Sequence, residues 1–261
     1  MSLKGKMALV SGSTSGIGLG IARALAAQGV DILLNGFGEP AEIERLRAEI
    51  AESGGVRVRH AGADIGDPAQ VRAMVAGAEG AFGRLDILVN NAGVQFTAPI
   101  EAFPDEQWDR LIAINLSGAF HATKAAIPGM RRRGWGRIIN VASAHGLVAS
   151  AHKAAYVAAK HGIVGLTKVT AIELANSGIT ANAICPGWVL TPLVQVQIDA
   201  RARQEGRSVG EVEQALLAEK QPMTRFTAAE QIGALVVFLC SEAASTITGA
   251  PLSIDGGWLA Q

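Results

Sequence analysis

Short aliphatic runs alternate along this chain with longer stretches whose apolar residues recur at helical spacing. Runs such as Met7–Val10 and Asp86–Val89 contain no alternation of apolar and polar residues. A strand of this kind is buried on both faces, which is typical of a parallel sheet with helices packed on each side. The pattern therefore predicts an α/β fold, with a doubly wound parallel sheet and helices on both faces.

The expected strands and helices follow one another at regular intervals. The strands are predicted at Met7–Val10, Asp31–Leu34, Val56–His60, Asp86–Val89, Arg137–Val141, Ile179–Cys185 and Pro251–Ile254. The helices are predicted at Gly18–Gln28, Pro40–Ser53, Pro68–Phe82, Asp105–Arg133, Ala154–Ser177 and Ala228–Cys240. Residues 192–222 break this rhythm with a helical segment after a strand end, where doubly wound sheets bind ligands. We expect one domain over residues 1–261, with a small helical lid insertion at about 192–222.

The charges of the chain cancel, because 23 Lys and Arg balance 23 Asp and Glu, so no overall field attracts nucleic acid or an anionic membrane. Both cysteines, Cys185 and Cys240, lie in apolar runs, where buried thiols are expected rather than disulfides. The N-terminus lacks the apolar segment of a signal peptide, and no apolar stretch is long enough to span a bilayer. We predict a soluble cytoplasmic protein without nucleic-acid or membrane partners and without a metal site.

The first strand is followed by a glycine-rich turn, Gly12-x-x-x-Gly16-x-Gly18, at the start of the first helix. Glycines allow a tight turn and let backbone N–H groups at a helix N-terminus approach a pyrophosphate. The spacing differs from the Gly-x-Gly-x-x-Gly fingerprint of many dinucleotide-binding proteins. A phosphate site is expected at this turn. Its other candidate contacts are Thr14, Ser15 and Ile17.

The end of the second strand indicates which nicotinamide dinucleotide would bind. A carboxylate there takes the ribose hydroxyls of NAD, whereas an arginine takes the 2′-phosphate of NADP. The chain has Asn35-Gly36-Phe37-Gly-Glu39, with Gly36 or Phe37 at the expected carboxylate position and no basic residue. A 2′-phosphate would stay unpaired, so the sequence favours NAD. Asp64 and Ile65, after the third strand, are candidates for the adenine edge, although an Asp there is also typical of a turn.

Tyr156 is the only tyrosine of the chain and lies four residues before Lys160 on a predicted helix. Positions i and i+4 share a helix face, so the phenol and the ammonium can point the same way. Lowering a phenol pKa from about 10 to near 7 requires roughly 4 kcal/mol of preferential stabilisation of the phenolate. Lys160 and an oxidised nicotinamide would supply two positive charges for this. Alone, the pair is more typical of an amphipathic helix with a half-buried Tyr and a solvated Lys.

Six motifs occur in a fixed order along the chain. They are Gly12-x-x-x-Gly16-x-Gly18, Asn90-Asn91-Ala92-Gly93, Asn115, Ser143, Tyr156-x-x-x-Lys160 and Pro186-Gly187. In this order and spacing they resemble the short-chain dehydrogenase/reductase family, and the resemblance covers essentially the whole chain. It implies a Rossmann-like fold, a nicotinamide cofactor and, as in most members, a homotetramer.

That resemblance implies a role for each catalytic candidate. Tyr156 would exchange a proton with the substrate oxygen, and Ser143 would orient and polarise that oxygen. Lys160 would lower the tyrosine pKa and hold the nicotinamide ribose, and Asn115 would bind a water that links Lys160 to solvent. The further cofactor contacts that the family implies are Asn91, Ala92, Gly93, Pro186, Gly187, Val189 and Thr191.

Four polar side chains are expected near the tyrosine and indicate the kind of substrate. They are Gln95, His145, Lys153 and Gln197. Each alone is also typical of a surface or strand-end residue. A lysine in the first turn of a helix opposes the helix dipole, so Lys153 is expected to serve a bound anion. Together the four could clamp a carboxylate, with charge from Lys153 and donors from the others.

An indole next to this clamp suggests a short substrate, since Trp188 could close the pocket over a small alkyl chain. The segments Ser143-Ala-His145-Gly, His152-Lys153 and Trp188-Val-Leu-Thr191 resemble family members that act on short 3-hydroxy acids. The resemblance implies reversible conversion of D-3-hydroxybutyrate to acetoacetate with NAD. The partner is then a short 3-hydroxy or 3-keto carboxylate.

Other functions fit part of the same sequence. A 3-oxoacyl thioester reductase or a sugar dehydrogenase of the family would use the same Tyr156 and Lys160. Acyl-carrier substrates usually go with NADP, which the missing basic residue after the second strand disfavours. A non-catalytic NAD(H)-binding sensor is a third alternative, but it would not need the full set of catalytic candidates.

Overall fold

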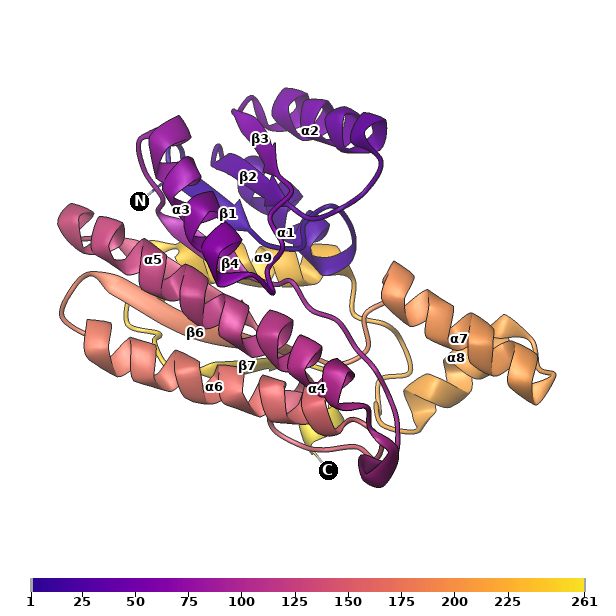
Figure 1. Cartoon of the computed structure of the whole chain (residues 1–261). Coiled ribbons are helices and arrows are strands. Elements are labelled where there is room, and N and C mark those ends of the chain that lie inside the picture. Colours follow the sequence, from indigo (N-terminus) through magenta and orange to yellow (C-terminus); the bar gives the residue numbers. More distant parts are fainter. Residues whose placement is uncertain (1, 261) are drawn as a thin grey trace.

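The computed structural model describes residues 2–260 and shows a seven-stranded sheet with helices on both faces (Figure 1). All strand pairs are parallel, in the order β3-β2-β1-β4-β5-β6-β7. The strands are β1 Met7–Val10, β2 Asp31–Asn35, β3 Val58–Ala61, β4 Ile87–Asn90, β5 Gly136–Val141, β6 Ile179–Pro186 and β7 Pro251–Ile254. The predicted doubly wound, Rossmann-like fold is confirmed. The strand order reverses between β1 and β4, where such sheets bind ligands.

Helices cover both faces of the sheet, as strands without polar alternation require. The helices of the described chain are α1 Gly16–Ala26, α2 Pro40–Gly54, α3 Pro68–Phe82, α4 Asp105–Ile112, α5 Gly118–Arg133, α6 Ala154–Leu174, α7 Pro192–Glu205, α8 Val209–Ala218 and α9 Ala229–Cys240, and all but α7 and α8 pack near the sheet. α1 and α9 pack together on one face, and α3, α5 and α6 cover the other (Figure 1). Neighbouring residues of β1 point to opposite layers, because Ala8 packs with α1 and α9 whereas Leu9 packs with α3 and α5.

One predicted helix, Asp105–Arg133, is interrupted in the structure. α4 and α5 are joined by a π-helical turn, Ala113–Ser117, which carries Asn115. The buried Asn115 side chain accepts the Val94 N–H and donates to the Val94 carbonyl, both at 2.8 Å. Single π turns inside helices are frequent at functional sites, and this one holds the segment that follows β4.

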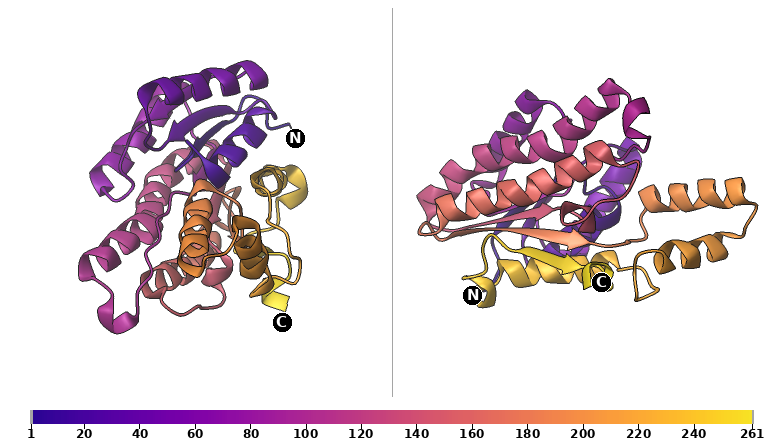
Figure 2. Two further views of the ribbon diagram at one scale, coloured as in Figure 1. Left: turned by 90° about the vertical axis from the view of Figure 1, so that its right-hand side faces the viewer. Right: turned by 90° about the horizontal axis from the view of Figure 1, so that it is seen from below.

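A helical hairpin of α7 and α8 stands away from the sheet (Figure 2). The two helices have a small core of their own, formed by Ile198, Ala202 and Val212. Thr191 caps α7, since its hydroxyl accepts the Val194 N–H at 3.3 Å. The hairpin occupies the segment for which an insertion was predicted, and its movement as a lid stays a prediction.

Three further predictions concern the environment of the chain. Within residues 2–260, no helix is long and apolar enough to cross a membrane. Cys185 and Cys240 are both free and buried, as their apolar surroundings predicted. In the part of the chain that the structure describes, no three His, Cys, Asp or Glu side chains are arranged to hold a metal ion.

Candidate active site

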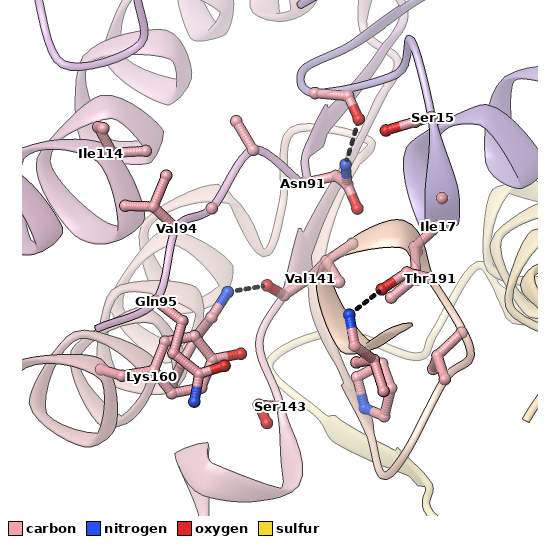
Figure 3. Close-up of a pocket in the computed structure, with 18 of the residues that line it drawn as sticks. Ser15, Ile17, Asn91, Val94, Gln95, Ile114, Val141, Ser143, Lys160 and Thr191 are labelled. Carbon is pink, nitrogen blue, oxygen red and sulfur yellow. Dashed lines mark hydrogen bonds between the residues drawn. The ribbon is translucent and has the colours of Figure 1, made fainter. Parts of the chain in front are cut away.

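A cleft of about 560 Å³ lies where the strands end, next to the base of the hairpin (Figure 3). Most of the predicted site residues line it. These are Gly12, Thr14, Ser15, Gly16, Ile17, Phe37, Asp64, Ile65, Asn91, Ala92, Gly93, Gln95, Ser143, His145, Lys153, Tyr156, Lys160, Pro186, Gly187, Trp188, Val189 and Thr191. Three others, Gly18, Asn115 and Gln197, lie behind this lining and contact the residues that form it.

The glycine-rich turn after β1 needs glycine for two different reasons. Gly12 has φ +61, and a Cβ there would lie 2.8 Å from the Cα of Ala92, so the turn and the segment after β4 are in direct contact. Gly18 lies beneath the turn, where a Cβ would be 2.3 Å from the Gly12 carbonyl oxygen. The Asn91 side chain donates to that same oxygen at 2.9 Å. Gly18 therefore supports the turn from behind and does not face the cleft.

The loop after β2 is held by a residue that the sequence patterns did not reveal. Asn35 accepts the Gly12 N–H at 3.2 Å and donates to the carbonyls of Ala61 and Ala63. In the sequence, its only signal is a polar residue at the end of an apolar strand. In the structure, the Asn35 side chain is buried. Phe37 is 69% exposed, and its carbonyl accepts the Thr14 hydroxyl at 3.1 Å.

The catalytic candidates lie together where β5 meets α6. Ser143 follows β5, and its hydroxyl accepts the His145 N–H at 3.1 Å, which fixes the hydroxyl position. Lys160 of α6 is 4% exposed and donates from Nζ to the Val141 carbonyl at 2.7 Å (Figure 3). Its Nζ lies 5.6 Å from the centroid of the Tyr156 ring. The structure therefore places these predicted residues side by side.

Burial controls the proton affinities of this group. Burial raises the pKa of Tyr156 above its ordinary value, and a hydrogen bond with the Ser143 side chain lowers it only in part. Burial also disfavours the charged form of Lys160 and therefore lowers its pKa to about 8. The tyrosine pKa of the protein on its own thus moves opposite to the lowering we expected, because desolvation dominates. A protonated phenol at neutral pH suits a proton donor.

Asn115 borders a small internal cavity behind the cleft. The cavity has a volume of about 10 Å³ and is also bordered by Asn90 and Lys160. That volume is close to the minimum for a single water, which needs about 10–15 Å³. The predicted water at Asn115 stays a prediction, and the observed hydrogen bonds of its side chain go to Val94.

Aromatic rings form the wall of the cleft next to Tyr156. The His145 ring meets Tyr156 edge to face at 5.9 Å between centroids, and it meets Trp258 in the same way at 5.1 Å. Trp188 lies 6.0 Å from Trp258. Trp258 was missed by the sequence patterns, although Asp255-Gly-Gly-Trp258 after the last strand is a turn that can fold back over the strand ends.

Two buried donors at this end of the cleft have no acceptor. Gln95 Nε2 and Trp188 Nε1 are buried, and neither has a hydrogen-bond partner among residues 2–260. The Gln197 side chain donates from Nε2 to Gln95 Oε1 at 3.4 Å, so Gln197 reaches the cleft through Gln95. Buried polar groups are normally paired. These donors therefore favour a ligand that accepts hydrogen bonds.

Positive charge accompanies the donors. Lys153 Nζ lies 5.4 Å from the centroid of the Trp188 ring, and burial lowers its pKa, with the Lys220 charge adding to the effect. Lys153 is the residue just before α6 rather than inside its first turn, and His152, with an uncommon φ of +65, turns the chain there. Among the described residues that line the cleft, Asp64 after β3 is the only carboxylate. This end of the cleft is therefore suited to an anion.

Comparisons with known proteins identify the family of the chain. A family profile described as enoyl-(acyl carrier protein) reductase matches residues 12–259. The chain belongs to the short-chain dehydrogenase/reductase family.

Individual relatives are similar over nearly their whole length. D-beta-hydroxybutyrate dehydrogenase of Cupriavidus necator is 60% identical over 99% of this chain and 100% of its own. The protein of the same name from Rhizobium meliloti is 54% identical over 98% and 99%. Among solved structures, L-sorbose reductase from Gluconobacter frateurii, complexed with NADPH and L-sorbose, has a TM-score of 0.95 and 32% identity, and the match covers 100% of both chains.

Proposed function

We propose that this protein is an NAD-dependent dehydrogenase that interconverts D-3-hydroxybutyrate and acetoacetate. The observation that carries the proposal is the pair of unpartnered donors and the Lys153 charge beside Tyr156 and Ser143. A 3-keto acid matches both features, because it has a carboxylate at one end and a carbonyl oxygen near it. The names of the Cupriavidus and Rhizobium relatives support this substrate, and the D configuration rests on them alone.

The residues of the cleft fit a nicotinamide dinucleotide. Gly12 leaves backbone, without a side chain, beside Ala92, and α1 begins without a side-chain cap, so its first N–H groups are open to a pyrophosphate. When bound, the nicotinamide supplies or accepts the hydride at C3 of the substrate. The proposed pyrophosphate contacts are Gly12 and Thr14 to Ile17. The proposed adenosine contacts are Phe37, Asp64 and Ile65. The ribose and nicotinamide contacts are Asn91, Ala92, Gly93, Tyr156, Lys160, Pro186, Gly187, Val189 and Thr191.

The chain's own residues then bind the substrate and move the proton. Lys153, His145 and the unpaired N–H groups of Gln95 and Trp188 bind the carboxylate, with Gln197 holding Gln95. Ser143 donates to the keto oxygen, and Tyr156 transfers its phenolic proton to that oxygen when acetoacetate is reduced. In the reverse direction the phenolate takes the proton from the 3-hydroxyl. Lys160 stabilises the negative charge on the phenolate. Trp188 and Trp258 exclude water around the methyl group of the substrate.

A substrate panel tests the proposal. Purified protein with NADH should reduce acetoacetate far faster than an acetoacetyl thioester, an uncharged methyl ketone or L-sorbose. In the oxidising direction with NAD, D-3-hydroxybutyrate should be consumed and the L enantiomer should not. If a thioester or sugar is the best substrate, the proposed substrate is wrong. If nothing in the panel is reduced, the non-catalytic sensor becomes the better account.

The low pKa of His145 predicts that this residue causes no pH dependence of the KM for acetoacetate near neutral pH. Burial lowers this pKa from 6.5 to about 4, and the charges of Lys153, Lys220 and His161 add to the effect. The ring is thus neutral above about pH 4 and gains its charge only below that value. We expect the KM for acetoacetate to show no break caused by His145 between about pH 5.5 and 7.5, whereas an ordinary histidine would titrate there. A break near pH 6.5 that disappears in His145→Gln but persists in His161→Gln would contradict this assignment.

The preference for NAD gives a second prediction. Residues 36–39 directly after β2 include no basic side chain, and Arg23 and Arg45 line an adjoining hollow where Arg23 is paired with Glu49 at 2.6 Å. Phe37→Arg should lower the KM for NADPH by about tenfold, because a charge-assisted hydrogen bond to the 2′-phosphate contributes about 1.5 kcal/mol or more. The KM values for NADPH and NADH measure this, with Phe37→Leu as the control. A wild-type protein that already prefers NADPH would contradict the proposed cofactor.

The likeness to L-sorbose reductase favours a second candidate, an NADPH-dependent reductase of sugars. A sugar carries no charge, so it would leave Lys153 and the unpaired donors of Gln95 and Trp188 without an anionic partner. The carboxylate substrate therefore fits this cleft better. The L-sorbose arm of the panel distinguishes the two candidates.

The remaining proposals concern assembly and location. Trp108 of α4 and Phe120 of α5 are exposed, and so are Val169 and Ile172 of α6. Large apolar side chains gathered on helix surfaces favour burial against other copies of the chain. We propose a homotetramer in the cytoplasm, which light scattering on the purified protein and cell fractionation would test.

A further inference from the structure

Gln221 lies at the base of the hairpin, three residues after the end of α8, where the chain returns to the body of the protein. The chain enters the hairpin after β6 and returns from it to α9 (Figure 2). Trp188 lies in the first of these connections and Thr227 in the second. Gln221 is only 1% exposed. A fully buried amide between a projecting hairpin and a substrate wall calls for a structural reason.

The Gln221 carboxamide uses both of its ends. Its Oε1 accepts the backbone N–H of Trp188 at 3.0 Å. Its Nε2 donates to the carbonyl oxygens of Met223 at 3.0 Å and of Arg225 at 2.7 Å. One acceptor and two donors are thus satisfied, a combination that a neutral amide supplies and a carboxylate does not.

Two glycines make room for this side chain. A Cβ on Gly187 would lie 2.7 Å from Gln221 Oε1, and a Cβ on Gly256 would lie 2.5 Å from Nε2. Gly187 precedes Trp188, and Gly256 lies in the turn that leads to Trp258. The same amide is therefore packed between the two chain segments that carry the aromatic wall of the cleft.

The backbone of Trp188 is held from both sides as a result. The Trp188 N–H donates to Gln221 Oε1. The Trp188 carbonyl accepts the Thr227 N–H at 2.9 Å. The indole that this backbone carries packs 6.0 Å from Trp258 and lies under the Lys153 ammonium. Movement of Gln221 would consequently displace the wall against which the substrate is proposed to bind.

We propose that Gln221 is a positioning residue for substrate recognition, joining the return segment of the hairpin to the Trp188 wall. The expected effect of Gln221 on kinetics rests on the proposed function. The hydrogen bonds that join Gln221 to the hairpin do not depend on which substrate is bound. The residue itself contacts neither substrate nor cofactor in this account.

Two variants of Gln221 test the proposal. Gln221→Glu keeps an oxygen that can accept the Trp188 N–H but replaces the amide donors with a second carboxylate oxygen. Gln221→Met keeps the approximate side-chain volume but makes none of the three hydrogen bonds. The exposed Gln214 of α8 offers a matched control, Gln214→Glu. We expect the KM for acetoacetate to rise between about 10-fold and 100-fold in both Gln221 variants, as when a binding group is misplaced by about an ångström. The thermal midpoint should fall in both Gln221 variants but not in Gln214→Glu, because buried groups lose their hydrogen-bond partners. The KM for NADH should rise less than the KM for acetoacetate.

A second readout does not depend on the reaction. Trypsin can cleave at basic residues in or next to the hairpin, which are Arg201, Arg203, Arg207, Lys220 and Arg225. Cleavage there should be faster in the Gln221 variants than in the wild type or Gln214→Glu. If the wild type fails to reduce acetoacetate, the proposed function is wrong while proteolysis still tests the link. Unchanged cleavage and unchanged KM for acetoacetate would overturn the inference, and so would an equal rise of the KM values for NADH and for acetoacetate.

Discussion

Replacing Tyr156 with Phe should lower kcat for acetoacetate reduction by about 10²–10⁴-fold, the range expected when a general acid is removed. The substitution deletes one oxygen from the only tyrosine of the chain and leaves the ring that packs against His145. No other phenol can replace it. Steady-state rates with NADH measure the loss, and NADH affinity in a fluorescence titration should fall far less than kcat.

The NADH titration is the control for this variant, because a distorted cleft would weaken cofactor binding together with the rate. An intact NADH affinity with a rate close to that of the wild type would mean that another group donates the proton. In that case Ser143, which is hydrogen-bonded to Tyr156, would be the first group to examine.

Lys153→Met should raise the KM for acetoacetate by about 10-fold to 100-fold, since a hydrogen bond to a charged group contributes about 1.5–3 kcal/mol. The ammonium lies over Trp188, and Asp64, the only cleft-lining carboxylate among the described residues, follows the distant strand β3. Methionine keeps the aliphatic length of the side chain, so the packing against the indole is largely preserved. Kinetics with acetoacetate and with an uncharged methyl ketone measure the effect of the charge alone.

The exposed Lys168 of α6 provides a matched control for the loss of charge. Lys168→Met should leave both substrates unaffected, and Lys153→Met should spare the uncharged ketone and the KM for NADH. An equal loss for the acid and the ketone would show that Lys153 has a general structural role. An unchanged KM for acetoacetate would exclude it from the clamp.

The fold could be predicted well because its signal is local. A strand buried on both faces, such as Met7–Val10, is apolar throughout, and the structure has β1 and β7 at the predicted residues. The π turn at Ala113–Ser117 could not be predicted, because the apolar spacing of the surrounding helices continues through it. Its position depends on the bond between Asn115 and the backbone after β4, which brings together distant parts of the sequence.

The site was predictable where a residue stands at a strand end or belongs to a spaced motif, as Ser143 and Tyr156 do. Residues whose place depends on tertiary closure were missed. Trp258 joins the cleft only because the C-terminal turn folds back over β6, and Gln221 lies between two segments that meet only in the folded chain. Asn35 was missed for a different reason, since a polar residue at a strand end does not reveal which backbone groups it will bind.

The central claim is that this cleft recognises a 3-keto acid by its carboxylate. The most direct measurement compares kcat/KM for acetoacetate with that for methyl acetoacetate, using the same enzyme and NADH. The ester keeps the keto group and the short chain but removes the negative charge. We predict a preference for the acid of at least about 100-fold, because the ester would leave Lys153 and the buried donors without an anionic partner. Equal values, or a preference for the ester, would contradict the account.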